Sequence, residues 1–383
     1  MSSTAKRREG FAMAVAMVAI VVIGALIAGA FFTSTQEYRI GRNSLVDQRA
    51  FSAAEAGVNQ PIQAWIKALN LSVNNYETRP ADTLKLAEGA YAVRRVTRLD
   101  PYTFWVVSDG YAGPSSGPLA SHHRANAIYR LTMPRFNIMG ALTVRGQVTV
   151  QGSSSIDGAD AIPPDWASGG ICPAAGPPMP GVVAPDTSVV CSGTCPDDKF
   201  GRLQGDPPKV QSPAAADTNT YYRYGDENWN TLIANADIKL PPGNYKPLPD
   251  YTGTCDVTRN TNWGDPERLG VCKDYFPIIY VDGDLNLQAN ARGQGVLMVN
   301  GSLSMAGGFI FTGIVIVRND IKSTGNGNKI TGSAFAGNTY TTDNSSVTGD
   351  SEIHFSSCAI ERAARASAMV VRMKQRGFAE MIQ

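Results

Sequence analysis

The longest apolar stretch of the sequence lies near its N-terminus. Residues 11–32, from Phe11 to Phe32, contain no charged side chain. A helix of this length, rising about 1.5 Å per residue, spans roughly 33 Å, enough to cross a hydrocarbon core of about 30 Å. Residues 1–10 form a basic leader with Lys6, Arg7 and Arg8, which favours a cytoplasmic N-terminus. The pattern predicts one transmembrane helix at 11–32 with the remaining chain exported.

Helical periodicity continues beyond the apolar run. Over residues 33–70 apolar side chains recur at intervals of three and four, which predicts an amphipathic extension of the same helix. Pro61 predicts a kink or the end of the first part of this extension. The apolar positions are Ile40, Val46, Ala50, Phe51, Ala54, Val58, Ile62, Trp65, Ile66 and Leu69.

Two alternatives to a processed, helix-packing segment stay open. Ala28-Gly29-Ala30 is a small-residue pattern typical of a signal-peptide cleavage site, although the apolar run exceeds the usual core of about 7–15 residues. A plain uncleaved membrane anchor has the same composition. The first residue of the mature chain distinguishes the three interpretations: Phe11, Phe31 or Met1.

The most specific motif follows the apolar helix. Gly10-Phe11 ends the leader, and the later stretch reads Gln48-Arg-Ala-Phe-Ser-Ala-Ala-Glu-Ala-Gly57. These features resemble the N-terminal domain of PilX-type pilus-assembly proteins, within the wider type IV pilin and pseudopilin group. The resemblance covers about residues 7–60. Its motif residues are Arg49, Ala50, Phe51, Ala54, Glu55, Ala56 and Gly57.

The resemblance implies processing and assembly. A prepilin peptidase would cut after Gly10 and methylate Phe11, and the helix would then pack in a filament or dock on one. The implied partners are other pilins or pseudopilins, the inner-membrane assembly machinery and the prepilin peptidase. Major pilins carry Glu at the fifth mature position, which is Val15 here. The resemblance therefore favours a minor, priming or tip-associated component, held in the inner membrane by a single pass and associated with a pilus.

A second pattern repeats in the C-terminal half with a period of 18 residues. Alternating apolar segments begin at Val281, Val299, Val317 and Phe335, and Val144–Val150 has the same pattern upstream. A short fixed period of this kind predicts a β-solenoid, here over 136–160 and 276–357, with the four starting residues stacked in its core. The predicted corners, with positive φ, are Gly283, Gly301, Asn319 and Gly337.

Residues 161–275 differ in composition and read as an insertion into the solenoid. They hold 16 of the 23 prolines and five of the six cysteines. An exported segment of this kind predicts disulfides, with Cys255–Cys272 as the favoured local pair. One pair among Cys172, Cys191 and Cys195 would leave an odd thiol, which could either pair with Cys358 or stay buried. A zinc site at Cys191 and Cys195 lacks a second ligand pair, so no metal is predicted.

The remaining segments complete an α+β fold. Strands predicted at Tyr91–Val93, Phe104–Val107 and Ala127–Leu131 place a small β unit over 71–135 that packs on the long helix. Residues 358–383 have helical periodicity, and we expect this C-terminal helix to cap the open end of the solenoid; docking on an anionic surface is the alternative. The aromatic cluster Tyr221, Tyr222, Tyr224 and Trp229 predicts a small satellite core, or else a binding patch for a partner or a sugar.

Charge and chemistry narrow the function. The net charge is +1, which argues against a nucleic-acid binder. No Ser/His/Asp motif, phosphate loop or HExxH occurs. Asp282 and Asp284 could form a carboxylate pair in a membrane-tethered β-helix enzyme acting on polysaccharide, but aspartate at a turn ordinarily caps backbone donors. The sequence predicts a non-catalytic assembly protein without a cofactor, open to a surface or glycan ligand; a static surface adhesin is the third hypothesis.

Overall fold

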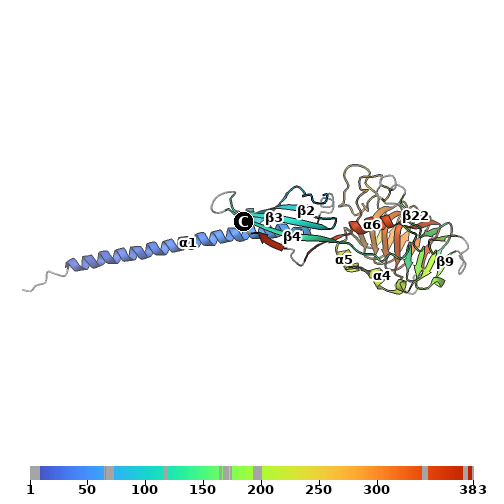
Figure 1. Ribbon diagram of the computed structural model, residues 1–383, viewed down its shortest axis with the longest axis horizontal. Helices are drawn as coiled ribbons and strands as arrows, with labels where there is room; N and C mark the ends of the chain where they lie inside the picture. The colour runs from blue at the N-terminus through green and yellow to red at the C-terminus, as the bar shows by residue number, and fades with distance from the viewer. Residues whose placement is uncertain are drawn as a thin grey trace, which may run out of the picture. The chain divides into compact units, whose positions relative to one another are not determined.

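The computed structural model describes residues 9–63, 65, 73–114, 120–163, 166, 172, 175–192, 201–338, 344–373 and 378–381. The chain divides into two compact units. Unit 1 comprises Met1–Leu131 and Val370–Gln383, and unit 2 comprises Thr132–Met369. A long N-terminal apolar helix is thus followed by a largely β body that carries disulfides (Figure 1).

The N-terminal helix is continuous. Helix α1 runs from Glu9 to Gln63, so the predicted transmembrane and amphipathic segments are one element (Figure 1). It ends at Gln63 and not at residue 70, since Trp65 is not helical. The end falls two residues after Pro61, which has no N–H to donate and whose ring crowds the preceding turn. Residues 1–8 and 66–72 lie outside the described part of the chain.

Unit 1 is an antiparallel sheet against α1. Strands β2, β3 and β4 occur where the sequence predicts strands. The sheet follows the order β1-β2-β3-β4, with β25 and β26 both pairing with β4. Tyr129 of β4 donates its hydroxyl hydrogen to the carbonyl oxygen of Val58 in α1 at 2.5 Å. The strands are β1 Asp82–Lys85, β2 Tyr91–Arg98, β3 Thr103–Ala112, β4 Ser121–Thr132, β25 Met369–Arg372 and β26 Phe378–Met381.

The C-terminal segment differs from the prediction of a helix over 358–383. Helix α6 spans only Ser357–Ala366, and the tail then returns as β25 and β26 to the sheet of unit 1. Phe378 lies opposite Ala127 in that pairing. The helix does not cap a sheet end. It packs across the middle strands of the larger sheet of unit 2, β18 Arg292–Val299, β20 Ile310–Val317 and β22 Asn326–Ala336. Its buried Cys358, Ala359 and Ala363 form the apolar face that makes this contact.

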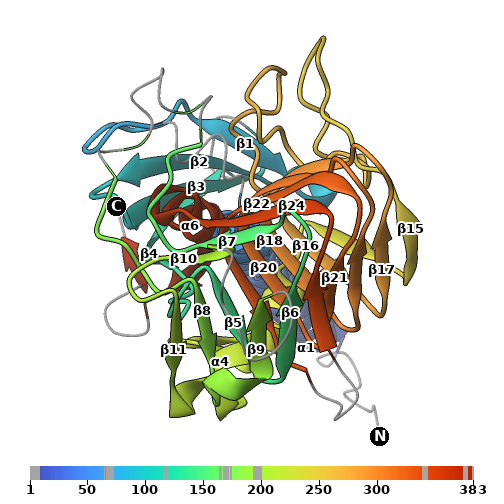
Figure 2. The same cartoon turned by 90° about the vertical axis from the view of Figure 1, so that its right-hand side faces the viewer.

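Unit 2 is built from two parallel sheets, and the strands β16, β18, β20 and β22 of the larger one lie side by side in Figure 2. The larger follows the order β10-β7-β24-β22-β20-β18-β16-β14, with β5, β8 and β11 paired beside this path, and the smaller follows β15-β17-β19-β21-β23-β6-β9. The strands are β5 Leu142–Val144, β6 Gln147–Val150, β7 Ser155–Asp157, β8 Val182–Ala184, β9 Val190–Ser192, β10 Leu203–Gln204, β11 Lys209–Gln211, β14 Ile238–Leu240, β15 Gly243–Tyr245, β16 Ile278–Val281, β17 Leu285–Leu287, β18 Arg292–Val299, β19 Leu303–Met305, β20 Ile310–Val317, β21 Ile321–Ser323, β22 Asn326–Ala336, β23 Asn344–Val347 and β24 Asp350–Phe355.

The strand registers follow the 18-residue period until β22. Val281 lies opposite Val299, and Val299 lies opposite Val317. Val317 then faces Ala336, so the predicted stacking of Phe335 on Val317 is wrong by one residue. Because successive strand residues point to opposite faces, this shift places Phe335 on the other side of the sheet, next to Ile314 and Ile316.

The predicted corner residues are needed for a different reason than expected. Of the four, only Gly283 has positive φ, at 141°. A Cβ atom at Gly301 would lie 2.4 Å from an Asp284 carboxylate oxygen, and one at Gly337 would lie 2.6 Å from the Arg318 carbonyl oxygen. Successive turns approach too closely for a side chain there, so crowding selects glycine. Asn319 lacks positive φ, which occurs instead at Asn338, at 41°.

The segment 161–275 is part of the sheets, and the prediction of an excursion out of them is wrong. It supplies β8, β9, β10, β11, β14 and β15, each paired in parallel within the two sheets. The predicted Cys255–Cys272 disulfide is confirmed, and Cys172 bonds to Cys358. Cys191 is also disulfide-bonded, whereas Cys195 lies outside the described residues.

Among the described residues, unit 2 has two large cores and a smaller one formed by Trp166, Phe276, Cys358 and Ala359. Between the sheets, the Val281 column of the larger faces the Leu285 column of the smaller. On the outer face of the larger sheet a second core contains Tyr221, Tyr224 and Trp229 beside Met298. The predicted aromatic satellite core is therefore confirmed for these three rings. They lie in or next to the short elements α4 Asn219–Tyr222, β12 Arg223–Tyr224, β13 Glu227–Asn228 and α5 Trp229–Ala234.

Candidate functional site on the N-terminal helix

The first part of α1 exposes its apolar side chains. Phe11 and Phe31 are each 76% exposed, and the large apolar side chains from Met13 to Leu45 are exposed like them. The helix is long and apolar enough to cross a membrane, and none of its most apolar stretch is buried. Exposure of this kind marks a surface that another apolar phase covers, either lipid or protein.

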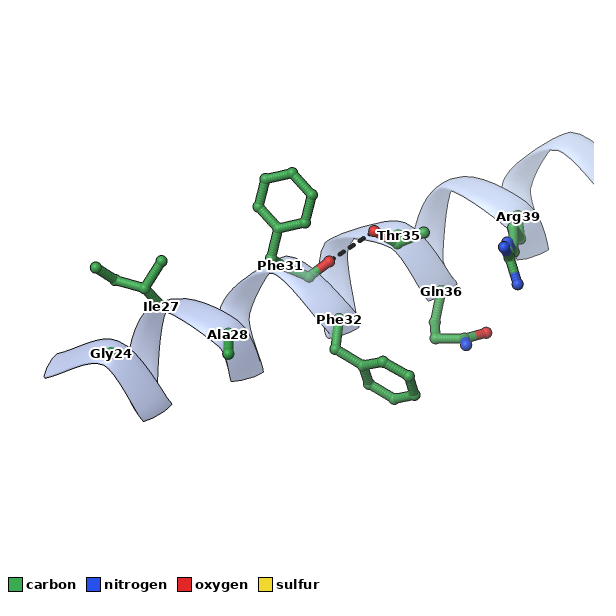
Figure 3. Close-up of a pocket in the computed structure, with 8 residues that line it drawn as sticks. All are labelled: Gly24, Ile27, Ala28, Phe31, Phe32, Thr35, Gln36 and Arg39. Atoms are coloured by element: carbon green, nitrogen blue, oxygen red, sulfur yellow. Dashed lines mark hydrogen bonds between the residues drawn. The ribbon is translucent and has the colours of Figure 1, made fainter. Parts of the chain in front are cut away.

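Figure 3 shows the surface of this part between Gly24 and Arg39. Ile27, Phe31 and Phe32 project from the backbone, whereas the small residues Gly24 and Ala28 leave a shallow depression in the helix surface between them (Figure 3). A depression at small residues lets the backbone of a second helix approach closely. Here Thr35 donates its hydroxyl hydrogen to the Phe31 carbonyl oxygen at 2.7 Å, so its polar group is satisfied inside the helix.

The second part of α1 packs on the sheet of unit 1 through small residues. Ala50, Ala54 and Val58 are fully buried. A Cβ atom at Gly110 of β3 would lie 2.2 Å from both the Ala50 carbonyl oxygen and the Ala54 backbone nitrogen. The helix and strand backbones can therefore meet only because Gly110 has no side chain. A Cβ atom at Gly57 would likewise meet the Ser108 hydroxyl oxygen at 2.2 Å.

Polar contacts fix the helix at the edge of this packed surface. Asp47 accepts hydrogen bonds from the Ser121 hydroxyl at 2.7 Å and from His123 Nε2 at 2.9 Å, and these bonds lower the pKa of the Asp47 carboxyl. Phe51 meets the His123 ring edge-on at 5.8 Å between ring centroids. Arg49 forms an ion pair with Glu88.

The structure thus gives most of the predicted motif an intramolecular role. Arg49, Ala50, Phe51, Ala54 and Gly57 contact or approach the sheet of unit 1, whereas Glu55 is exposed and Ala56 is half-buried. Gly10 lies in the first turn of α1 and Phe11 begins its exposed part, far along the helix from the motif. The motif and the processing residues are joined by the helix and do not form one pocket.

The opposite face of the sheet in unit 1 contains a buried carboxylate that sequence reasoning missed. Asp109 is 1% exposed and accepts hydrogen bonds from Arg95 at 2.7 Å, Arg124 at 2.5 Å and His122 at 3.2 Å. Burial raises the pKa of Asp109, but the bonds from Arg124, His122 and Arg95 outweigh it, so the net pKa lies below its ordinary value. Asp109 and Arg124 face each other because β3 and β4 pair in this register, which lies beyond the ends of the two strands that the sequence predicts.

Asp282 and Asp284, the candidate catalytic pair, both accept hydrogen bonds within the turns of unit 2. Asp282 accepts hydrogen bonds from Asn300 at 2.9 Å and from the Tyr280 hydroxyl at 2.7 Å, and these bonds lower the pKa of the Asp282 carboxyl. Asp284 accepts one from the Ser302 backbone nitrogen at 2.8 Å. Each aspartate thus joins its own turn to the next one. Within the described residues no group of three His, Cys, Asp or Glu side chains could hold a metal ion.

A likeness to known proteins is found among solved structures. No known family model matches the chain, and no curated protein matches its sequence. Among solved structures, the chain is similar to the competence-associated pilin ComZ from Thermus thermophilus, with 13% sequence identity and a TM-score of 0.23. The match covers 88% of this chain and 98% of that chain. Because the TM-score is low, we infer nothing about fold or function from it.

Proposed function

We propose that the protein is a pilin-like subunit that is anchored in the inner membrane by α1 and carries an exported β body. Within that class we assign it a minor, priming or tip-associated role of the PilX type in a type IV pilus or a related secretion filament. One observation carries the proposal: the single helix α1 exposes an uncharged apolar part, and its motif-bearing part is packed on its own sheet.

The proposed mechanism is assembly. The exposed part of α1 would lie in the membrane until it exchanges lipid contacts for contacts with the helices of other pilins or pseudopilins. Lipid tails and neighbouring helices are similarly apolar, so close packing at small residues such as Gly24 would favour the exchange. The buried part, at Ala50 and Ala54, would keep the exported body attached to the helix during transfer.

We further propose that unit 2 is a β-solenoid and that it is not catalytic. Parallel pairing at 18-residue intervals and a continuous core between the two sheets support the first point. The engagement of Asp282 and Asp284 in turn hydrogen bonds supports the second. Polysaccharide cleavage by the purified chain that is lost in Asp284→Asn would instead establish the enzyme hypothesis.

N-terminal sequencing of the protein from its native cell tests the anchor. We expect the mature chain to begin at Phe11, and Gly10→Ala to leave the leader attached. Gly41→Ala is the matched control, since Gly41 lies on the same helix and an added Cβ atom there would have no neighbour within 4 Å. A mature chain that begins at Met1, or at Phe31 after signal-peptide cleavage, would contradict prepilin processing.

A gene deletion tests the role in assembly. We expect loss of pili, of twitching or of secretion, with restoration by the native gene and no restoration by the Gly10→Ala variant. Normal filaments in the deletion strain, counted by electron microscopy, would refute the assembly role even where Phe11 is the first residue.

A further inference from the structure

A hollow on unit 2 combines aromatic rings with amide and guanidinium groups. It has a volume of about 530 Å³ and is lined by residues of α4, β12, β13, α5, β16 and the turns that follow β18 and β20. We propose that this hollow binds an acidic saccharide, a sugar ring that carries a carboxylate. The inference is independent of the assembly role. It rests on Tyr222, Trp229, Tyr280, Asn300 and Arg318.

The aromatic rings form one wall of the hollow. Tyr222 packs edge-on against Trp229 at 5.6 Å between centroids, and Trp229 packs edge-on against Tyr280 at 6.4 Å. Trp229 is anchored in the second core of unit 2, whereas Tyr222 is half-buried. Trp229 and Tyr280 are buried, so Tyr222 presents the accessible aromatic surface. A pyranose ring presents an apolar C–H face, which packs on an aromatic ring of this kind and leaves its hydroxyl groups at the rim.

A hydrogen-bonded ladder forms the polar wall. The Tyr280 hydroxyl donates to Asp282 at 2.7 Å, and Asn300 Nδ2 donates to the same carboxylate oxygen at 2.9 Å. Arg318 donates to the Asn300 amide oxygen at 2.8 Å. Asp282, Asn300 and Arg318 follow one another at the 18-residue period, each directly after a valine of the stacked column. The ladder fixes the orientation of the amide and guanidinium groups before a ligand arrives, which lowers the entropic cost of binding.

The charge of the lining indicates an acidic ligand. The hollow is lined by two guanidinium groups, Arg223 and Arg318, and no described lining residue is a carboxylate. A guanidinium group is planar and donates two parallel hydrogen bonds to a carboxylate. Asparagine amides both donate and accept, so they match sugar hydroxyls, which do the same. The amides are those of Asn219, Asn228, Asn230 and Asn300.

The Tyr280 hydroxyl remains a donor at all working pH values. Burial, together with the hydrogen bond to Asp282, raises the pKa of Tyr280 to about 12. Asp282 accepts hydrogen bonds from Tyr280 and Asn300, and it does not line the hollow. The charged groups that line the hollow are therefore those of Arg223 and Arg318.

Isothermal titration calorimetry of the full chain in detergent tests the proposal with two matched probes. Trigalacturonate and α-1,4-galactotriose are both α-1,4-linked chains of galactose-type rings, and the two probes differ in the carboxylates. We expect trigalacturonate to bind at least about tenfold more tightly than galactotriose, a difference of about 1.4 kcal/mol. Arg318→Gln should remove that preference, and Tyr222→Ala should weaken the binding of both probes.

Arg259→Gln is the control, since Arg259 is an exposed arginine of unit 2 that pairs with Asp250 and does not line the hollow. It should bind like the unaltered chain. Hydrogen–deuterium exchange of each variant verifies that unit 2 stays folded. Absence of binding for both probes at millimolar concentration, unchanged binding in Arg318→Gln, or equal affinity for an acidic peptide would overturn the proposal.

Discussion

The two units of the chain place their closest backbone contacts differently. In unit 1 the closest approach is between a helix and a strand, where Gly110 meets the backbone of Ala50 and Ala54. In unit 2 it is between neighbouring strands of one sheet. Gly295, Gly313 and Gly332 lie opposite one another in register, with φ of 105°, 138° and 143°.

The comparison shows two uses of glycine. At Gly110 the backbone is in an ordinary conformation, and only the missing side chain matters. At Gly313 and Gly332 the backbone adopts a conformation that L-residues rarely adopt, and a Cβ atom would also lie 2.1 and 1.8 Å from the carbonyl oxygen of the preceding glycine in the column. The stacked strands of unit 2 should therefore tolerate substitution less than the helix contact of unit 1.

The largest effect is expected for Gly332→Ala. Positive φ costs an alanine about 1–2 kcal/mol, and forcing its methyl group against a backbone oxygen adds about 1–3 kcal/mol. Unit 2 should lose about 3–4 kcal/mol of its free energy of unfolding, measured by hydrogen–deuterium exchange of its peptides. Gly253→Ala is the control, since Gly253 has φ of 83° with open space around it and should cost only the conformational part. Equal losses in both variants would show that crowding is unimportant.

The second largest effect is expected from removing a disulfide, which should destabilise unit 2 and leave unit 1 unchanged. All six cysteines belong to unit 2. Removing Cys255–Cys272, which closes a loop with a sequence separation of 17, should cost unit 2 about 3 kcal/mol. A Cys255→Ala/Cys272→Ala variant should show faster exchange in the peptides of unit 2 and unchanged exchange in the strands of unit 1. Faster exchange in the strands of unit 1 as well would contradict the independence of the two units.

Gly110→Ala tests the helix contact of unit 1. The methyl group would push α1 off β3, at a cost of about 2–3 kcal/mol, because overpacking at a backbone contact cannot be relieved by side-chain rotation. Exchange should rise in residues 46–58 and in β3, with unit 2 unchanged. Gly41→Ala on the exposed part of α1 should instead stabilise the helix slightly, by up to about 1 kcal/mol. A neutral Gly110→Ala would mean that the helix is not held as closely as described.

Local signals in the sequence account for what could be predicted. The apolar run and the helical periodicity up to Pro61 fix α1 without help from the rest of the chain. The 18-residue period fixes the pairing of Val281, Val299 and Val317, because each repeat carries the same alternation. The glycine column was also visible in principle, since Gly295 and Gly313 are one period apart.

The features that the sequence did not reveal depend on distant partners. The strands β8, β9 and β14 are three residues long, too short to show a period, and only their neighbours in the sheets define them. The tail forms β26 because β4 offers an open edge, although its own pattern is helical. The shift at Phe335 comes from one extra residue between Val317 and Ala336, which no single repeat can signal.

The smallest effect, and the one most sensitive to pH, concerns Asp109 in unit 1. Its folded-state pKa lies below the ordinary value, so the ionised carboxylate stabilises unit 1 above the unfolded pKa, and this contribution is lost as the pH falls through the folded pKa. Asp109→Asn should cost roughly 1–3 kcal/mol at pH 7, since charged hydrogen bonds to Arg95 and Arg124 are lost. The difference between the two chains should shrink as the pH is lowered below about 4. Unit 2 contains no part of this cluster, so hydrogen–deuterium exchange in its peptides should be unaltered by Asp109→Asn at any pH. If the stability difference between the two chains in unit 1 stayed constant as the pH fell well below 4, the ionised role of Asp109 would be contradicted.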